Sequence, residues 1–146
     1  MARDFFSTPH VIIADDERGL LTMMGEFCRE QGWSVETCVD GNELVDAVMA
    51  GTAPALLLID IMMPELDGIE VIDRIHHQDR PLRVRFMSGG VEAQIRAANL
   101  IATAKNMNVG ANIKKPITTE KLQAILDEEE RVVDGLAGLR QRRAMP

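Results

Sequence analysis

Five polar residues of this 146-residue chain could together carry out chemistry, and each lies just after a short apolar run or close behind one. They are Asp15, Asp16, Asp60, Ser88 and Lys115. Carboxylates brought together repel one another, and one or more would be protonated unless a cation relieved the repulsion. A hard divalent ion with oxygen ligands, usually Mg²⁺, answers that need. An oxygen nucleophile beside such a Lewis acid and an ammonium group is what phosphoryl transfer to a carboxylate requires.

The elements that must position these side chains alternate along the chain. Apolar runs typical of buried strands occupy residues 10–14 and 55–59, and residues 33–39, 82–87 and 109–113 are the other three expected strands. Apolar residues recur at helical spacing between these runs and after the last one. This alternation predicts an α/β fold, a doubly wound five-stranded parallel sheet with helices on both faces. Ligands of such sheets bind beyond the carboxyl ends of the strands, where the five polar side chains would meet.

Local signals mark two helix starts and the state of the cysteines. Asp67 followed three residues later by Glu70 predicts a capping box, and Thr118 predicts the cap of the last helix. Cys28 and Cys38 fall on apolar positions with no CxxC or Cys/His cluster around them. We therefore expect two free thiols in the core rather than a disulfide or a zinc site.

Composition excludes several classes of function. One ordinary domain is expected from the chain length. Aromatic residues make up 3% of the chain, Tyr is absent and the net charge is −7, which argues against a nucleic-acid partner. The N-terminus lacks the apolar run of a signal peptide, and no stretch is long enough to cross a membrane. These features predict a cytoplasmic protein without a membrane partner.

One continuous segment carries a specific signature. Residues 60–68, Asp-Ile-Met-Met-Pro-Glu-Leu-Asp-Gly, have the form D-x-x-M-P-x-x-D-G. The acidic pair Asp15-Asp16 precedes it, and Ser88 and the pair Lys115-Pro116 follow it in order. Over about residues 9–128 the chain resembles the receiver domains of response regulators in bacterial two-component systems. The resemblance implies a flavodoxin-like fold with strand order 2-1-3-4-5.

The resemblance also implies roles for the site residues. Asp60 would accept a phosphoryl group from a histidine kinase or a histidine phosphotransfer protein. Mg²⁺ would be bound by Asp16, Asp60 and the backbone carbonyl of Met62, with Asp15 acting mostly through water. Lys115 would pair with the phosphoryl oxygens. Ser88 would swing inward to bond one of them and shift an inactive–active equilibrium.

Two departures from the family pattern affect the expected behaviour. Family members commonly carry Tyr or Phe three residues before the Lys-Pro lysine, whereas this chain has Asn112. Coupling of Ser88 to an aromatic side chain is therefore not expected. Met62 and Gly90 flank the phosphorylation site by family position, and neither side chain can hydrogen-bond an attacking water. We expect slow self-dephosphorylation.

The lengths of the expected segments indicate how this chain would pass on a signal. We expect a tail over residues 1–8, a receiver domain over 9–130 and a C-terminal helix extension over 131–146, too short for a DNA-binding domain. A stand-alone regulator would signal through a downstream protein, or act as a shuttle or phosphate sink, and would not be an enzyme beyond its own phosphorylation and dephosphorylation. A pseudo-receiver that works without phosphorylation is the alternative. A phosphatase of the haloacid dehalogenase type normally needs D-x-D, but Ile61 and Met62 follow Asp60.

Overall fold

A parallel β-sheet forms the centre of the computed structural model, which describes residues 8–90 and 92–144. Its strands are β1 (His10–Ala14), β2 (Ser34–Cys38), β3 (Ala55–Asp60), β4 (Leu82–Ser88), β5 (Asn108–Val109) and β6 (Ile113–Lys114). They follow the order β2-β1-β3-β4-β5, and β6 also pairs with β4. The predicted fold class and strand order are confirmed. Residues 1–7 of the expected N-terminal tail, and residues 145–146, lie outside the described residues.

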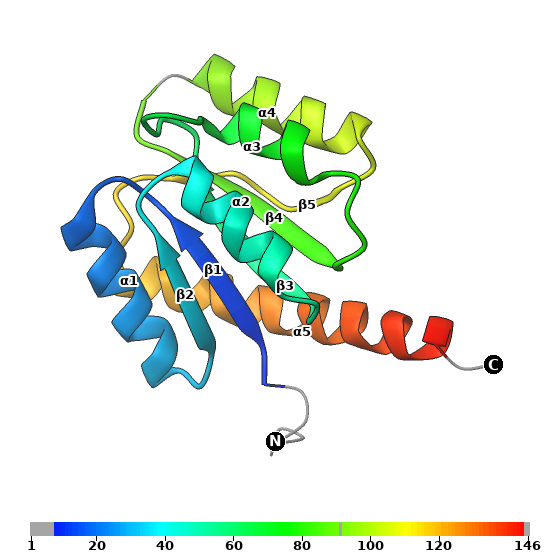
Figure 1. The fold of residues 1–146 in the computed structure, drawn as a ribbon. Helices are drawn as coiled ribbons and strands as arrows, with labels where there is room; N and C mark the ends of the chain where they lie inside the picture. The colour runs from blue at the N-terminus through cyan, green and yellow to red at the C-terminus, as the bar shows by residue number, and fades with distance from the viewer. Residues whose placement is uncertain (1–7, 91, 145–146) are drawn as a thin grey trace.

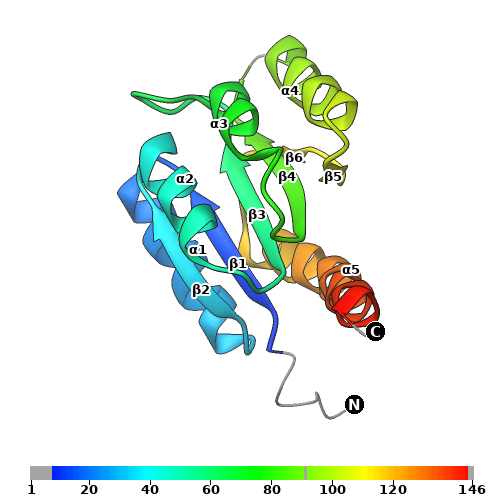
Figure 2. The same cartoon turned by 45° about the vertical axis from the view of Figure 1, so that its right-hand side comes forward.

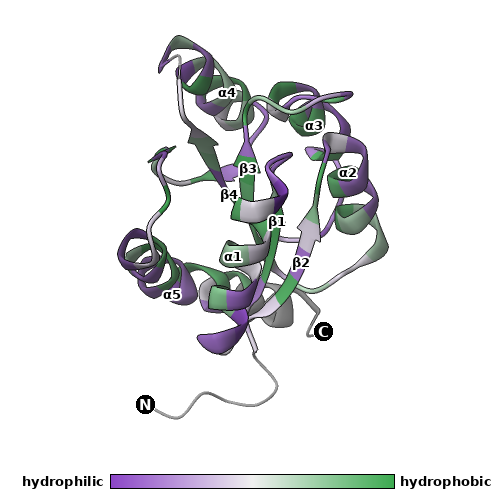
Figure 3. Ribbon diagram, turned by 90° about the vertical axis from the view of Figure 1, so that its left-hand side faces the viewer, coloured by the Kyte–Doolittle hydropathy of each residue, from purple (hydrophilic) through white to green (hydrophobic). Residues whose placement is uncertain are grey.

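Five helices cover the two faces of the sheet. They are α1 (Arg18–Glu30), α2 (Gly41–Ala50), α3 (Gly68–Ile75), α4 (Glu92–Ala104) and α5 (Thr119–Ala144). Helices α1 and α5 lie on one face, and α2, α3 and α4 lie on the other, so the molecule has three layers (Figures 1 and 3). No helix among residues 8–90 and 92–144 is long and apolar enough to cross a membrane.

Burial on both faces explains why β1 and β3 read as continuous apolar runs. All six residues of β3 are buried, and its side chains alternate between the two cores. Leu57 and Ile59 pack on the α2–α3–α4 side, whereas Leu56 and Leu58 pack on the α1–α5 side. Both cysteines are free and buried, as predicted, and burial raises the pKa of each thiol to about 12. At neutral pH they are therefore unreactive thiols of the core.

The fifth strand differs from the sequence prediction of one continuous strand over 109–113. Two short strands, β5 and β6, occupy this position, and both pair with β4 (Figure 2). Gly110 N–H donates to the Val84 carbonyl at 2.8 Å, but the Ala111 carbonyl accepts from Arg85 Nε at 2.8 Å. Because a side chain from β4 takes the place of a ladder partner, the strand is interrupted between its two short halves.

Side-chain caps fix the starts of two helices near the carboxyl edge of the sheet. Glu70 N–H donates to Asp67 Oδ1 at 2.9 Å, and Glu70 Oε1 accepts from Asp67 N–H at 3.4 Å. This reciprocal pair confirms the predicted capping box of α3. Thr118 Oγ1 accepts from Lys121 N–H at 3.1 Å, which confirms the predicted cap of α5. Both helices begin within a few residues of the candidate site residues.

Candidate functional site

The parallel strands deliver the predicted polar residues to one edge of the sheet. Asp15 and Asp16 directly follow β1, Asp60 is the last residue of β3 and Ser88 is the last residue of β4. Lys115 directly follows β6, and its backbone N–H donates to the Ser88 carbonyl at 2.9 Å. Since all these strands point the same way, residues distant in sequence become neighbours at their carboxyl ends.

An ion-pair cluster joins Asp15, Asp60 and Lys115. Lys115 Nζ lies 2.7 Å from Asp15 Oδ2 and 3.4 Å from Asp60 Oδ2. Asp15 is fully buried, and Asp60 is 5% exposed. Asp15 Oδ1 accepts from Glu17 N–H at 2.9 Å, which fixes the orientation of that carboxylate. One ammonium group therefore lies between two buried carboxylates that belong to different strands.

The electrostatics of the cluster leave one carboxylate poorly stabilised. Burial and the neighbouring Asp15 raise the pKa of Asp60 from 3.8 to about 6, against the opposing effects of Lys115 and the Met62 backbone N–H. Burial alone would lower the pKa of Lys115, but the Asp15 and Asp60 carboxylates raise it on balance. The lysine thus stays charged, yet a single ammonium does not fully offset the repulsion between the two acids.

The residues present fit a hard divalent cation. Asp15, Asp16 and Asp60 each offer a carboxylate oxygen, and these three atoms lie within 4.8 Å of one another. Opposite ligands of a Mg²⁺ ion are separated by about 4.2 Å, so small side-chain rotations would bring the three oxygens around one ion. Asp15 Oδ2 is buried, and it is paired with the Lys115 ammonium at 2.7 Å. Asp16 is exposed, which leaves a side of the site open to solvent.

Ser88 and Met62 lie at the rim of this cluster. Ser88 is 9% exposed, and its Oγ accepts from Gly90 N–H at 3.2 Å. The Met62 backbone N–H hydrogen-bonds to the Asp60 carboxylate, while its side chain is 61% exposed. The hydroxyl has a partner within its own loop, which an inward movement would break. A role of the Met62 carbonyl in binding metal stays a prediction.

Sequence reasoning missed a second charged cluster. It lies on the α5 side of β4, nearer the amino end of that strand than the candidate site. Glu129 of α5 is 1% exposed. Its Oε2 lies 2.8 Å from Arg83 Nε, and its Oε1 lies 3.3 Å from Arg85 Nη1. The signal was present in the sequence: arginines at alternate positions of a strand expected to be buried imply an acidic partner across the sheet face.

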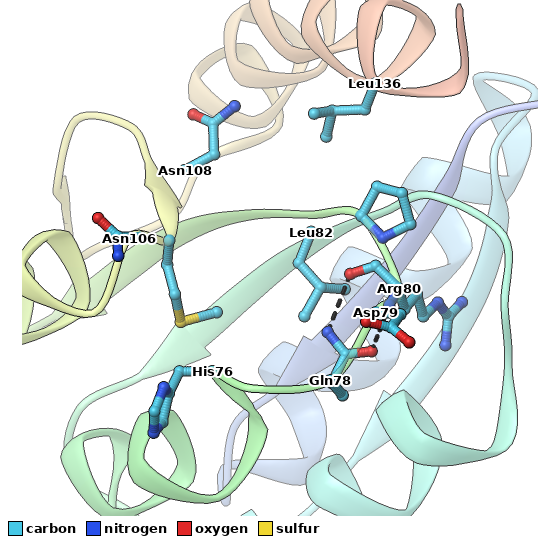
Figure 4. A pocket seen from close by; sticks show the side chains of 10 residues that line it. His76, Gln78, Asp79, Arg80, Leu82, Asn106, Asn108 and Leu136 are labelled. Atoms are coloured by element: carbon cyan, nitrogen blue, oxygen red, sulfur yellow. Dashed lines mark hydrogen bonds between the residues drawn. The ribbon is translucent and has the colours of Figure 1, made fainter. Parts of the chain in front are cut away.

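A sizeable cavity lies far from the carboxylates. It measures about 480 Å³ and lies at the amino ends of β4 and β5, where Leu82 and Asn108 line it (Figure 4). His76, at the end of α3, and Leu136 of α5 complete part of its wall. Because the acids and the lysine meet at the opposite edge, the site is an open polar cluster rather than an enclosed ligand cavity.

Comparisons with known proteins agree with this geometry. The transcriptional regulatory protein PrrA of Mycobacterium leprae is 30% identical over 118 residues, covering 81% of this chain and 48% of that protein. The transcriptional regulatory protein TrcR of Mycobacterium tuberculosis is 29% identical over 116 residues, covering 80% and 43%. The chain thus spans about half the length, or less, of these curated relatives.

Solved structures share the fold at lower sequence identity. A CheY-like response regulator receiver domain protein of Methanospirillum hungatei superposes with a TM-score of 0.75 at 20% identity, covering 88% of this chain and 98% of that one. The response regulator TrrA of Thermotoga maritima, solved in complex with Mg²⁺-BeF, has a TM-score of 0.67 at 17% identity, covering 83% and 98%.

The decisive comparison is with a family model. The model described as the response regulator receiver domain matches residues 11–127, most of the chain. The matched segment contains all three clustered carboxylates, Ser88 and Lys115. The chain therefore belongs to the family of response regulator receiver domains.

Proposed function

We propose that this receiver domain accepts a phosphoryl group on Asp60 in a Mg²⁺-dependent reaction. The donor is a histidine kinase or a histidine phosphotransfer protein of a two-component phosphorelay. One observation carries the proposal: three carboxylates from two strands lie within 4.8 Å of one another, and Lys115 Nζ is ion-paired to two of them. This arrangement has the nucleophile, the metal ligands and the cation that phosphoryl transfer to a carboxylate uses.

Each group has a distinct task. Asp15, Asp16, Asp60 and the Met62 carbonyl would hold Mg²⁺, which neutralises charge on the transferred group when bound. An oxygen of Asp60 attacks phosphorus, and the bond from phosphorus to the donor's imidazole nitrogen breaks. Lys115, which already lies 3.4 Å from Asp60 Oδ2, pairs with a phosphoryl oxygen. The Mg²⁺-BeF complex of the TrrA relative supports the choice of metal.

Signalling follows from movement of Ser88. We propose that its Oγ leaves the Gly90 N–H and bonds a phosphoryl oxygen, which releases the loop before α4. The signal would pass on through contacts with another protein in the cytoplasm, or the domain would act as a shuttle or phosphate sink.

We assign residues 9–130 to the receiver domain and residues 131–146 to an extension, an assignment that the family match over residues 11–127 supports.

Transfer from a small-molecule donor tests the proposal. The protein would be incubated with acetyl phosphate in Mg²⁺ or in EDTA, and uptake measured by intact mass. We expect uptake in Mg²⁺ alone, none in Asp60→Asn, and normal uptake in Asp46→Asn, which changes an exposed acid of α2. Uptake by Asp60→Asn, or equal uptake in EDTA, would contradict the proposal.

A phosphorylation-independent pseudo-receiver is the second candidate, favoured by Asn112 at the position of the usual aromatic residue. Asn112 Oδ1 accepts from Asn99 Nδ2 at 3.0 Å, so this position is tied to α4 by a polar contact. A wild-type protein that binds Mg²⁺ and yet takes up no phosphoryl group from acetyl phosphate or from kinases of its source would establish this alternative.

The phosphorylated form is expected to be long-lived. Met62 and the exposed Gly90 offer no side-chain donor or acceptor of the strength needed to orient a water toward phosphorus. We predict a half-life of minutes or longer without a phosphatase, and a shorter one in Met62→Glu or Met62→Gln. Loss of phosphate would be followed by intact mass after removal of the donor. Decay of the wild type within seconds would contradict this prediction.

A further inference from the structure

The backbone around Lys115 is held by a contact that the proposed reaction does not itself explain. Lys121, in the first turn of α5, directs its ammonium group at the two residues that flank Lys115. Its Nζ donates to the Lys114 carbonyl at 2.6 Å and to the Pro116 carbonyl at 3.0 Å. One charged group therefore bridges the carbonyls of the two residues that flank Lys115.

Other contacts show that this bridge is one part of a fixed frame. Lys121 N–H donates to Thr118 Oγ1, which anchors the residue to the start of α5. On the opposite side, Lys115 N–H donates to the Ser88 carbonyl at 2.9 Å. The segment is thus tied to β4 through its own amide and to α5 through the carbonyls of its neighbours. Hydrogen bonds to a charged donor are roughly twice as strong as neutral ones, so the Lys121 contacts add rigidity to this frame.

The position of that backbone decides where the Lys115 ammonium lies. The Lys115 side chain is 19% exposed, and its Nζ is already paired with Asp15 and Asp60. A largely enclosed side chain has little freedom to compensate for a shift of its own Cα atom. Reaction geometry is sensitive on this scale, because a displacement of about 1 Å at a catalytic group can cost about 100-fold in rate.

From these contacts we infer that Lys121 is a positioning residue for Lys115, acting through the two carbonyls that it bridges. The inference rests on the proposed function, since it assigns Lys121 to the phosphoryl site, although Lys121 touches neither Asp60 nor the metal ligands in the contacts observed. A purely structural role would stabilise α5 without affecting phosphoryl uptake.

The experiment compares three variants of the full chain. Lys121→Met removes the charge at similar size, and Lys121→Arg keeps donors that can reach both carbonyls. Lys114→Met is the matched control, since Lys114 is an exposed neighbour whose ammonium makes no hydrogen bond or ion pair with a described residue. For each variant, the initial rate of phosphoryl uptake from acetyl phosphate, the affinity for Mg²⁺ and the hydrogen exchange of the Lys115 amide are measured.

Lys121→Met is expected to slow uptake about fivefold to tenfold, with unchanged Mg²⁺ affinity, because the carboxylates are untouched. The Lys115 amide should exchange about tenfold faster, while the Ile12 amide in β1 should not change, which shows that the fold is intact. Lys121→Arg should restore most of both properties, and Lys114→Met should behave as the wild type.

Several results would overturn the inference. One is a Lys121→Met variant with an unchanged rate of phosphoryl uptake and unchanged exchange of the Lys115 amide. Another is a Lys114→Met variant whose uptake rate falls as much as that of Lys121→Met. A third is a Lys121→Met variant whose Mg²⁺ affinity falls together with its uptake rate. Should the wild type take up no phosphoryl group, the proposed function fails, and exchange at Lys115 alone then decides whether Lys121 holds this segment.

Discussion

Replacing Glu129 with alanine is expected to lower the free energy of unfolding by about 3 kcal/mol. Glu129 is 1% exposed and pairs with both Arg83 and Arg85, whose side chains are 19% and 7% exposed. Removing the carboxylate leaves two largely buried guanidinium groups without their shared anion. The expected loss of stability is at the low end of the range for broken buried ion pairs. Arg83 still donates a hydrogen bond to Asn108, and Arg85 still donates one to the Ala111 carbonyl.

Glu128 provides the matched control for this prediction. It lies beside Glu129 on α5 and contacts Arg85 Nη1 at 3.1 Å, but its side chain is 67% exposed. An exposed pair contributes about 0–1 kcal/mol, so Glu128→Ala should change stability little. Urea unfolding at pH 7.5 measures both variants. Equal losses, or a loss below about 1 kcal/mol in Glu129→Ala, would show that the buried network does not stabilise the fold.

Replacing Asp60 with asparagine is expected to stabilise the protein without metal. The pKa of Asp60 rises from 3.8 to about 6 on folding, so the folded protein binds this proton more tightly than the unfolded chain does. Its contribution to stability is therefore greatest below about pH 4 and falls as the pH rises to about 6. A shift of about two units corresponds to about 2–3 kcal/mol, and Asp60→Asn should be more stable by that order at pH 7.5 in EDTA.

Magnesium should reduce the stability advantage of Asp60→Asn over the wild type. The ion binds the ionised wild-type site and stabilises the folded state by mass action. The quantity to measure is the difference in unfolding free energy between wild type and Asp60→Asn, from pH 4 to 8, in EDTA and in Mg²⁺. Taking the difference removes the titration of other carboxylates, and Asp46→Asn controls for loss of a surface charge. A less stable Asp60→Asn in EDTA would contradict the raised pKa.

Much of the fold followed from local pattern. The runs at residues 10–14 and 55–59 read as strands because burial on both faces favours apolar residues along them. Parallel strands then placed Asp15, Asp60 and Lys115 at one edge, and the structure brings them into ion-pair contact. Caps at Asp67 and Thr118 were predictable because capping depends on residues three apart.

Other features depend on contacts between residues distant in sequence, which no local pattern encodes. The fifth strand is split because Arg85 of β4 takes the Ala111 carbonyl, and this pairing joins residues 26 apart. The close approach of Gly41 to the loop after β3 is another case: a Cβ atom there would lie 2.1 Å from the Leu66 carbonyl oxygen. No local pattern around Gly41 identifies that neighbour, which lies 25 residues further along the chain.

The central claim is that Asp15, Asp16 and Asp60 bind one divalent cation beside Lys115, and a Mg²⁺ titration followed by amide chemical shifts tests it most directly. We predict one saturable site at pH 7.5, with shifts concentrated at residues 15–16, 60–62, 88 and 115. Affinity should fall at least about tenfold in Asp16→Asn. Shifts spread over the exposed acidic surface, or an Asp16→Asn variant with wild-type affinity, would show that these carboxylates do not form a metal site.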